Sequence, residues 1–199
     1  MKNKLGIKNP IELSKKEEFL SKKRAKELFA NKLYLDYKCG TYAQLRFIHE
    51  YLFKDLYDFA GVLRQVNISK GGFRFAPVLY LESAISKIEK MPENTYDEII
   101  EKYVEMNIAH PFREGNGRSM RIWLDIMLKC NLGVIVEWSK IDKDEYLLAM
   151  QRSPIKDLEI KHLLKTALNN DCENYELLLN GIDASYNYEG YSEYIASKL

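Results

Sequence analysis

The sequence predicts a mainly α-helical domain that carries one β-hairpin. Apolar residues recur at helical spacing along most of the 199 residues. Residues 62–77 differ, because two short segments flank Gly71-Gly72 and alternate around Phe73 and Phe75, which is typical of a hairpin. Hydrophobic residues make up 46% of the chain, enough for one packed core, so we expect a helical bundle with a single hairpin.

Charge and composition argue against several classes of function. Thirty basic and 29 acidic residues give a net charge of +1, whereas a general nucleic-acid or membrane-surface binder would favour a large basic excess. No run of about 18 apolar residues occurs, and residues 1–8 contain no apolar signal core. We therefore expect a cytoplasmic protein that binds neither nucleic acid nor a membrane directly. Cys39, Cys130 and Cys172 are widely spaced and are interpreted as free thiols.

Residues 1–39 are expected to precede the domain proper. Residues 1–12 are interpreted as a loose arm, punctuated by Asn9-Pro10. Residues 14–35 show the apolar spacing of an amphipathic helix that lies on the body of the domain. The run Lys22-Lys23-Arg24 is interpreted as the solvated face of this helix.

The domain proper is expected to span residues 40–170 and to consist of successive helices. Thr41 is a good N-cap for a helix that continues to Ala60, with Gly61 at its C′ position. His49 in this helix and His162 further on are interpreted as structural histidines. Further helices are expected over residues 79–91, from the capping box Thr95–Glu98 to His110, and over residues 117–130, 142–153 and 155–169.

Residues 110–121 concentrate one imidazole, one carboxylate, two glycines and three arginines between two apolar segments. Pro111 cannot continue a helix normally and biases His110 away from helical conformation. The apolar run 122–128 then predicts a helix, so Gly115, Asn116 and Gly117 are expected in a tight loop that opens into its N-terminus. Phe112 is expected to insert into the core and anchor this loop.

Such a loop is suited to binding phosphate. The first N–H groups of a helix have no intrahelical partner and the macrodipole adds positive charge, so they form an anion cradle. Gly115 and Gly117 let the backbone approach a ligand closely. Arg118 and Arg121 lie three residues apart on one side of the helix, which suggests a polyphosphate.

Two further side chains supply what transfer of a phosphate group needs. Glu114 could hold Mg²⁺, which uses carboxylate oxygens together with substrate phosphates. His110 is placed to take a proton from an attacking hydroxyl. The alternative, a capped helix–loop–helix with a solvated basic turn, explains each residue singly but not their concentration within twelve positions.

The pattern His110-Pro111-Phe112-x-Glu114-Gly115-Asn116-Gly117-Arg118-x-x-Arg121 resembles the full signature of the Fic family of nucleotidyl transferases, with every fixed position filled. The resemblance extends over residues 40–170. It implies a Fic fold and transfer of AMP from ATP to a Tyr, Ser or Thr hydroxyl of a target protein, with release of pyrophosphate. It also implies a role for each residue: His110 as general base, Glu114 on Mg²⁺, the backbone of Gly115, Asn116 and Gly117 on the phosphates, and Arg118 and Arg121 on the β- and γ-phosphates.

Two other functions stay open at this point. One is a Fic-type transfer of another group: phosphoryl, UMP or phosphocholine. Gly117 favours AMP transfer, because Doc-type kinases of this superfamily carry a lysine there. The other is a catalytically silent binding module, against which the intact His110 and Arg121 argue.

The hairpin resembles the element that is called the flap in Fic proteins, on which an extended segment of the target pairs. A plain hairpin that only covers the core is the alternative. Lys70 is placed where it could reach a nucleotide phosphate, and Asn107, one turn before His110, could hydrogen-bond the loop. The resemblance assigns the flap to Ile68, Ser69, Lys70, Gly71, Gly72, Phe73, Arg74 and Phe75.

Residues 171–199 contain a second pattern. Ser185 and Glu189 are four residues apart, and Ser185-x-x-x-Glu189-Gly190 resembles the inhibitory motif that one subclass of Fic proteins carries at the C-terminus. The resemblance implies that Glu189 pairs with Arg121 and displaces the γ-phosphate of ATP. It makes Tyr186, Tyr188 and Tyr191 candidates for self-modification once the segment detaches. Some stand-alone relatives are toxins that modify ATP-binding subunits of type II topoisomerases, and some form oligomers, so both are expectations here.

Overall fold

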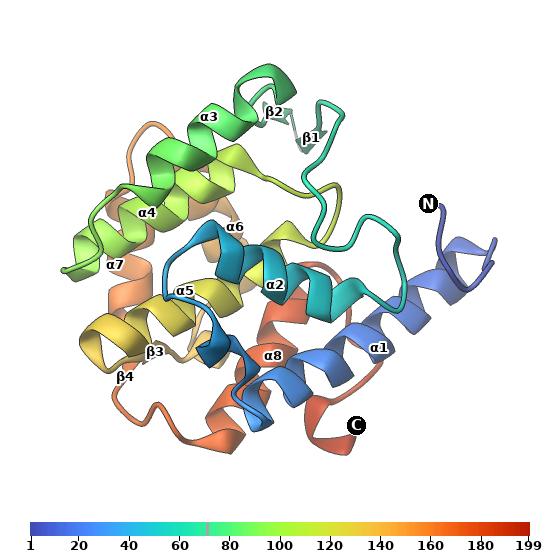
Figure 1. Ribbon diagram of the computed structural model, residues 1–199. Coiled ribbons are helices and arrows are strands. Elements are labelled where there is room, and N and C mark those ends of the chain that lie inside the picture. The colour runs from blue at the N-terminus through green and yellow to red at the C-terminus, as the bar shows by residue number, and fades with distance from the viewer. Residues whose placement is uncertain (71) are drawn as a thin grey trace.

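The computed structural model describes residues 1–70 and 72–199. Its centre is α5 (Asn116–Leu132), in which every residue from Arg118 to Leu128 is buried. This helix packs against α2 (Tyr42–Phe53), α4 (Tyr96–Ala109) and α8 (Tyr175–Tyr188) (Figure 1). A helix that is buried on all sides needs neighbours all round, so α5 is the helix on which the other elements are arranged.

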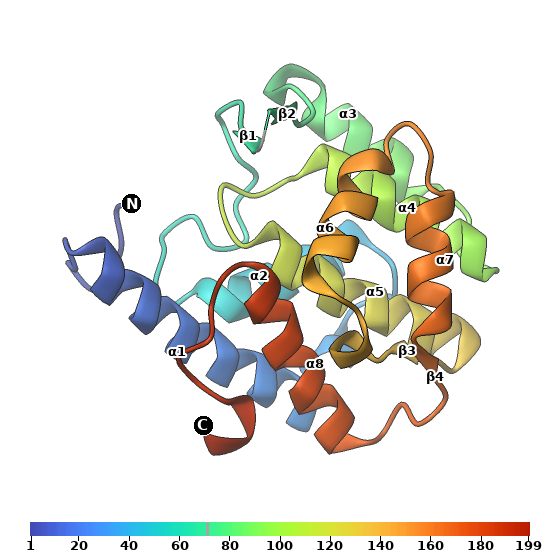
Figure 2. The same cartoon turned by 180° about the vertical axis from the view of Figure 1, so that it is seen from behind.

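The first and last helices of the chain lie side by side. α1 (Pro10–Ala30) packs against α2 and α8, and the short C-terminal 3₁₀ helix η3 (Ala196–Lys198) contacts α1 and α8 (Figure 2). The N-terminal helix therefore covers the same side of α5 as the C-terminal residues.

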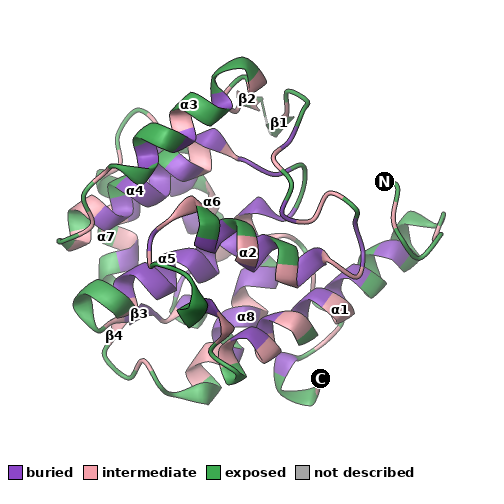
Figure 3. Ribbon diagram, viewed as in Figure 1, coloured by how far each residue is buried: buried purple, intermediate pink, exposed green. Residues whose placement is uncertain are grey.

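The remaining elements complete the bundle. α3 (Val78–Glu89) packs on α4, and α6 (Lys143–Arg152) packs on α7 (Leu158–Thr166). Buried residues line the inward faces of these helices (Figure 3). Two short 3₁₀ helices, η1 (Leu33–Asp36) and η2 (Trp138–Lys140), connect larger elements. The described residues also form two small antiparallel sheets: β1 (Ser69–Lys70) with β2 (Phe73–Arg74), and β3 (Ile135–Val136) with β4 (Leu168–Asn169).

The predicted fold class is confirmed: the chain is mainly helical. The predicted hairpin is also present, with Ser69 paired to Arg74 and Lys70 to Phe73. Gly71, which was assigned to the flap, lies outside the described residues. The pairing of β3 with β4 was not predicted. The expected helix over residues 155–169 is wrong at both ends: it begins at Leu158 and ends at Thr166, and Leu168 pairs with Val136.

Three predictions for the first third of the chain are wrong in detail. The first helix begins at Pro10, because the Asn9 side chain accepts hydrogen bonds from the N–H groups of Ile11 and Glu12. It ends at Ala30 rather than at residue 35. Lys22 is not solvated: its side chain is 2% exposed, and its Nζ lies 3.0 Å from Glu18 Oε1 and 2.8 Å from Asp183 Oδ1.

The predicted second helix is also too long. Thr41 caps it as expected, but it ends at Phe53 instead of Ala60. The chain then turns back, and Gly61 adopts a left-handed conformation with a φ of 72°. Its N–H donates to Nδ1 of the fully buried His49 at 2.8 Å, so His49 is structural, as predicted.

Two further expectations can be compared with the structure. Within residues 1–70 and 72–199, no helix combines the length and the apolar character that crossing a bilayer requires. Cys39, Cys130 and Cys172 are free thiols, as predicted.

Candidate functional site

The end of α4 fixes the backbone of His110. His110 adopts a left-handed conformation with a φ of 50°, and its N–H donates to Met106 O at 2.9 Å. Arg64, which is buried, donates from its guanidinium to His110 O at 2.7 Å and to Ala109 O at 3.0 Å. The backbone N–H of Arg64 donates to Pro111 O at 2.9 Å. A cation at the C-terminal carbonyls of a helix stabilises them, so Arg64 fixes the turn that presents His110.

The loop after His110 is fixed by buried side chains. Asn116 accepts from Phe112 N–H at 2.9 Å and donates to Phe112 O at 2.7 Å. Because His49 Nδ1 accepts the Gly61 N–H, its Nε2 carries the proton and donates to Glu114 O at 2.7 Å. The Phe112 ring is fully buried and stacks on His49 with centroids 3.8 Å apart, as its predicted anchoring role requires.

The two glycines of the loop serve different purposes. Gly115 has a φ of 78°, and a Cβ there would overlap the Phe53 ring, so Gly115 is needed for the backbone conformation and for packing. A Cβ on Gly117 would overlap the carboxylate of Glu189 and would lie 3.0 Å from Arg121 Nη1. Gly117 is thus the position where the bare backbone at the N-terminus of α5 meets a carboxylate.

The His110 ring is in the form that a general base needs. It stacks on Phe75 of the flap with centroids 3.6 Å apart, and its Nδ1 lies 3.2 Å from Asn107 O. A proton on Nδ1 donated to this carbonyl leaves Nε2 free to accept another. Burial lowers the pKa of His110 to about 4, so the imidazole is neutral at pH 7. Asn107 thus meets His110 through its main chain, and its side chain makes no hydrogen bond within the described part of the protein.

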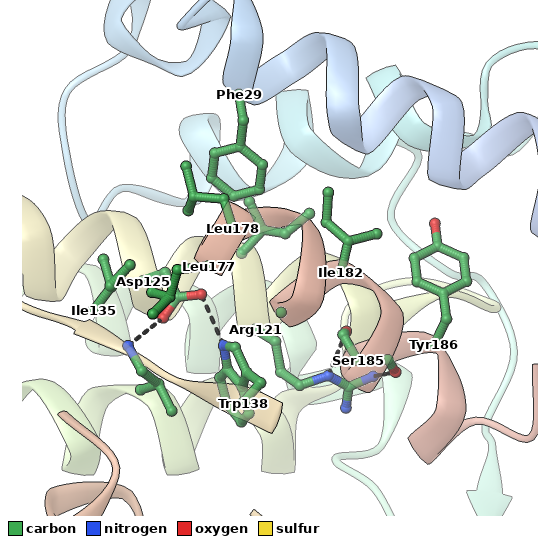
Figure 4. Close-up of a pocket in the computed structure, with 13 residues that line it drawn as sticks. Phe29, Arg121, Asp125, Ile135, Trp138, Leu177, Leu178, Ile182, Ser185 and Tyr186 are labelled. Carbon is green, nitrogen blue, oxygen red and sulfur yellow. Dashed lines mark hydrogen bonds between the residues drawn. The ribbon is translucent and has the colours of Figure 1, made fainter. Parts of the chain in front are cut away.

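Arg121, the second arginine of α5, contacts α8. Its Nε donates to Ser185 Oγ at 2.7 Å, and its Nη2 donates to Ser185 O at 2.7 Å and to Glu189 Oε1 at 3.1 Å. Figure 4 shows the guanidinium of Arg121 directed at Ser185. The expected contact of Arg121 with Glu189, 68 positions away in the sequence, is present, whereas its contact with Ser185 was not predicted.

The Glu189 carboxylate lies between two cations. Its second oxygen accepts from Lys70 Nζ of β1 at 3.0 Å. Burial opposes ionisation of Glu189, but the charges of Arg121, Lys70 and Arg118 outweigh it and lower its pKa to about 2. Lys70 is 71% exposed, so its pair with Glu189 is the weaker of the two. A carboxylate that is ionised at pH 7 therefore lies against the anion cradle.

Arg118, the first arginine of α5, has a partner that the sequence did not suggest. Its Nη2 lies 2.7 Å from Glu17 Oε1 of α1 and 3.5 Å from Glu114 Oε1. The Arg118 side chain is 1% exposed, whereas Glu114 is 46% exposed. Glu17 is separated from Arg118 by 101 residues, and no periodicity of the predicted amphipathic helix distinguished it from its neighbours.

Glu114 fits the predicted magnesium role in part. One of its oxygens accepts the Gly115 N–H at 3.0 Å, and the side chain borders the cradle with about half its surface open. Among the described residues there is no cluster of three or more His, Cys, Asp or Glu side chains that could hold a metal. Mg²⁺ commonly binds through one or two carboxylates plus substrate phosphates. Glu114 therefore fits Mg²⁺ that arrives with a nucleotide.

The residues after α8, here called the C-terminal segment (189–199), are tied to α1. Glu18 accepts the N–H groups of Glu193 and Tyr194 at 3.1 and 3.2 Å. Lys22 donates to Asp183 of α8 and to Tyr194 O. Both Glu18 and Lys22 are buried. A buried ion network on α1 thus holds the chain on both sides of Glu189.

α8 also closes on α5 along an apolar contact. A cavity of about 20 Å³, room for roughly one water, remains between them (Figure 4). Asp125 borders it and accepts from Val136 N–H at 3.0 Å and from the Trp138 indole at 2.8 Å. Burial raises the pKa of Asp125 to about 7. The cavity is lined by Phe29, Arg121, Ile122, Asp125, Ile135, Val136, Trp138, Leu177, Leu178, Gly181, Ile182, Ser185 and Tyr186.

The three candidate tyrosines have no solvent-exposed, unpartnered hydroxyl in this state. Tyr186 is 1% exposed and its hydroxyl is buried. Tyr188 donates to Trp138 O at 2.8 Å, and Tyr191 donates to Glu17 Oε1 at 2.7 Å. Modification of any of them requires the end of α8 to leave the body of the protein.

Comparison with known proteins agrees with this site. Residues 39–128 match the model of the Fic/DOC family. This part of the chain is therefore similar to the Fic/DOC family. Two relatives are a probable protein adenylyltransferase Fic of Escherichia coli K12, 33% identical over 125 residues, and one of Salmonella typhimurium, 29% identical over 171 residues. The alignments cover 57% and 79% of this chain, and 62% and 82% of those proteins. The protein adenylyltransferase VbhT of Bartonella schoenbuchensis is 32% identical over 162 residues, which are 73% of this chain and 32% of VbhT.

Solved structures show the Fic fold. The chain superposes on BepC of Bartonella tribocorum, solved with bound AMPPNP, with a TM-score of 0.70 and 20% identity over 85% of this chain and 92% of that one. A Fic domain of Bartonella quintana, solved with bound ADP, gives a TM-score of 0.70 and 23% identity over 85% and 90%. The matched Fic domain includes the loop and most of α5 but neither α1 nor α8.

Proposed function

We propose that this protein is an adenylyltransferase that moves AMP from ATP to a hydroxyl side chain of a target protein and releases pyrophosphate. The observation that carries the proposal is the joint between α4 and α5. There a neutral His110, with Nε2 free to accept a proton, stands next to a complete anion cradle. The E. coli and Salmonella relatives, each a probable protein adenylyltransferase, and the protein adenylyltransferase VbhT support the same activity.

The chemistry follows from the positions of the groups. The N–H groups at the start of α5 bind phosphate oxygens, and Arg121 binds the terminal phosphate. His110 Nε2 removes the proton from the target hydroxyl while that oxygen attacks the α-phosphorus, and the bond from this phosphorus to the bridging oxygen of pyrophosphate breaks. Glu114 would hold Mg²⁺, which neutralises charge on the phosphates when bound. Rate enhancement comes from alignment and electrostatics rather than covalent participation of the protein.

The proposal includes inhibition by the C-terminal segment. Glu189 takes the fork of Arg121 that would bind the terminal phosphate and lies against Gly117, where a phosphate oxygen would rest. Ser185 holds the same guanidinium from the side. ATP that binds despite Glu189 must place its α-phosphorus out of line with the attacking hydroxyl, and misplacement of about 1 Å can cost 10²-fold in rate.

The target is proposed to dock on the flap. β2 is the strand of the hairpin next to Phe75, whose ring stacks on His110, so a segment that pairs along the hairpin lies beside the base. Lys70 of β1 faces the cradle through Glu189 and is free to meet a phosphate when Glu189 leaves.

Incubation of Glu189→Gly with ATP, Mg²⁺ and a cell lysate, followed by mass spectrometry, tests the proposal. AMP adds about 329 Da to an attacked hydroxyl, whereas a phosphoryl group adds about 80 Da, so the experiment separates AMP transfer from the alternative donors. His110→Ala in the same background is the control and should label nothing. Absence of any AMP-modified protein with Glu189→Gly would contradict the proposed function.

A further inference from the structure

Glu17 is a buried carboxylate that the proposed chemistry does not use. It lies on α1, outside the residues that match the Fic/DOC model, and is 4% exposed. Among the described residues, its carboxylate accepts hydrogen bonds from three groups around the site: Arg118 at 2.7 Å, Tyr191 at 2.7 Å, and the hydroxyl of Tyr57. A carboxylate is rarely buried this far unless it is paired, and the partner here belongs to the first turn of α5.

Arg118 is only partly satisfied by these contacts. Its Nη2 donates to Glu17 and approaches Glu114, but its Nε and Nη1 are buried and have no hydrogen-bond partner among residues 1–70 and 72–199. The rings of Phe53, Tyr186 and Tyr191 pack around the guanidinium. Two of these rings belong to α8 and the C-terminal segment, so departure of that segment uncovers Arg118. Only Glu17, Phe53 and the loop then remain to hold its orientation.

We propose that Glu17 is a positioning residue for the nucleotide site, which fixes the plane of the Arg118 guanidinium beside the anion cradle and beside Glu114. The inference rests on the proposed adenylyl transfer and extends the site to α1. A planar fork held at one corner presents its remaining N–H groups in a fixed direction. Without Glu17, the Arg118 guanidinium can turn toward Glu114 or toward the phosphates. The triphosphate is then no longer held in one position with its α-phosphorus in line with the attacking hydroxyl.

A purely structural ion pair is the alternative, and it makes a different prediction. Buried pairs often contribute little net stability compared with an apolar pair, and a structural role would show in thermal stability alone. A positioning role predicts that kcat falls while the affinity for the nucleotide stays nearly the same. Glu17→Gln keeps the size of the side chain but replaces the charged hydrogen bond to Arg118 with a weaker neutral one, so the guanidinium is held less firmly. Nucleotide affinity should therefore be kept while alignment is lost.

The experiment compares Glu17→Gln with Glu18→Gln, both in the Glu189→Gly background. Glu18 is the matched control, because it is the adjacent residue on α1, is equally buried and contacts the C-terminal segment instead of Arg118. We expect Glu17→Gln to lower kcat for AMP transfer at least about tenfold, with the Kd for ADP changed less than about threefold. Glu18→Gln should not lower kcat. In an Arg118→Lys background Glu17→Gln should have no further effect, because the two residues act as a unit.

Equal rates for Glu17→Gln and Glu18→Gln, or additive effects with Arg118→Lys, would overturn the inference. If Glu17→Gln does not fold, Tyr57→Phe decides, since it removes one hydrogen bond from Glu17 and leaves the ring. A reduced kcat then supports the positioning role, and an unchanged kcat contradicts it. Failure of the Glu189→Gly parent to transfer AMP is a separate result, which contradicts the proposed function itself.

Discussion

The loop after α4 and the C-terminal segment both contact the Arg118 guanidinium, through Glu114 and Tyr191, but they are held in different ways. The loop is fixed mainly by hydrogen bonds to its own backbone, from Asn116, His49 and Arg64. The C-terminal segment is held largely by charges: Glu189 on Arg121 and Lys70, and Glu18 and Lys22 on residues 183–194. Backbone bonds define one geometry, whereas a charge network can be exchanged for another anion. This difference supports the proposal that the C-terminal segment is a removable cover over a fixed nucleotide site.

The largest effect is expected from the loop itself. His110→Ala removes the general base and should reduce AMP transfer by about 10²- to 10⁴-fold in the Glu189→Gly background. Because the loop is held by other residues, ADP binding measured by calorimetry should change little. A variant that loses ADP binding to the same extent as activity would show that His110 supports the cradle rather than the chemistry.

The next effect concerns the contact between the two regions. Glu189→Gly should raise the rate of AMP transfer by about 10²-fold over the parent protein, because the phosphates regain Arg121 and an aligned position. Initial rates with labelled ATP and lysate measure it. Identical rates of AMP transfer for the variant and the parent protein would contradict an inhibitory role of Glu189.

A smaller activation is expected from the attachment of the C-terminal segment to α1. Lys22→Met leaves Glu18 buried without its cation. Removing one partner of a buried ion pair destabilises a protein by on the order of 3–5 kcal/mol. The segment should then detach more often, with faster hydrogen exchange over residues 185–199 and several-fold higher transfer.

Lys15→Met is the control for this prediction. Lys15 also pairs with the C-terminal segment, 2.7 Å from Glu193, but both side chains are about half exposed. An exposed pair contributes little, so Lys15→Met should leave activity and exchange unchanged. Equal activation by the two variants would show that burial of the Lys22 network is irrelevant to the attachment.

The mildest effect concerns pH and the contact of α5 with η2 and β3. The pKa of Asp125 is raised by burial from 3.8 to about 7, so the folded state keeps a proton that the unfolded state has lost. Stability should therefore fall as pH rises from about 4 to about 7 and then level off, by roughly 1–4 kcal/mol in total. Asp125→Asn should remove this part of the pH dependence of Tm. An unchanged pH profile in the variant would contradict the assignment.

The site could be predicted from the sequence wherever its parts are local. His110 to Arg121 form one continuous loop and helix start, so their spacing already implies a phosphate site. Arg64, Glu17 and Lys22 reach partners 46, 101 and 161 residues away, and no local pattern reports such contacts. Lys22 illustrates the reason: in a run of three cations it resembles a solvated face, and only the packing of α8 on α1 buries it.

The fold shows the same division. The capping box at Thr95–Glu98 and the cap at Thr41 were identified because their bonds lie within a few residues. The end of α2 and the strand β4 were missed because contacts beyond the local sequence set them. After α2 the chain turns back so that the Gly61 N–H donates to His49 Nδ1, and β4 forms because Leu168 pairs with Val136. Local apolar spacing continued past both points and therefore gave the wrong boundary.

A structure of Glu189→Gly with ATP and Mg²⁺ bound tests the central claim most directly. The triphosphate should lie on the N–H groups at the start of α5, with Arg121 on the terminal phosphate in place of Glu189 and His110 Nε2 facing the space in front of the α-phosphorus. A triphosphate bound elsewhere, with Arg121 still on Ser185 and the cradle without phosphate, would contradict it.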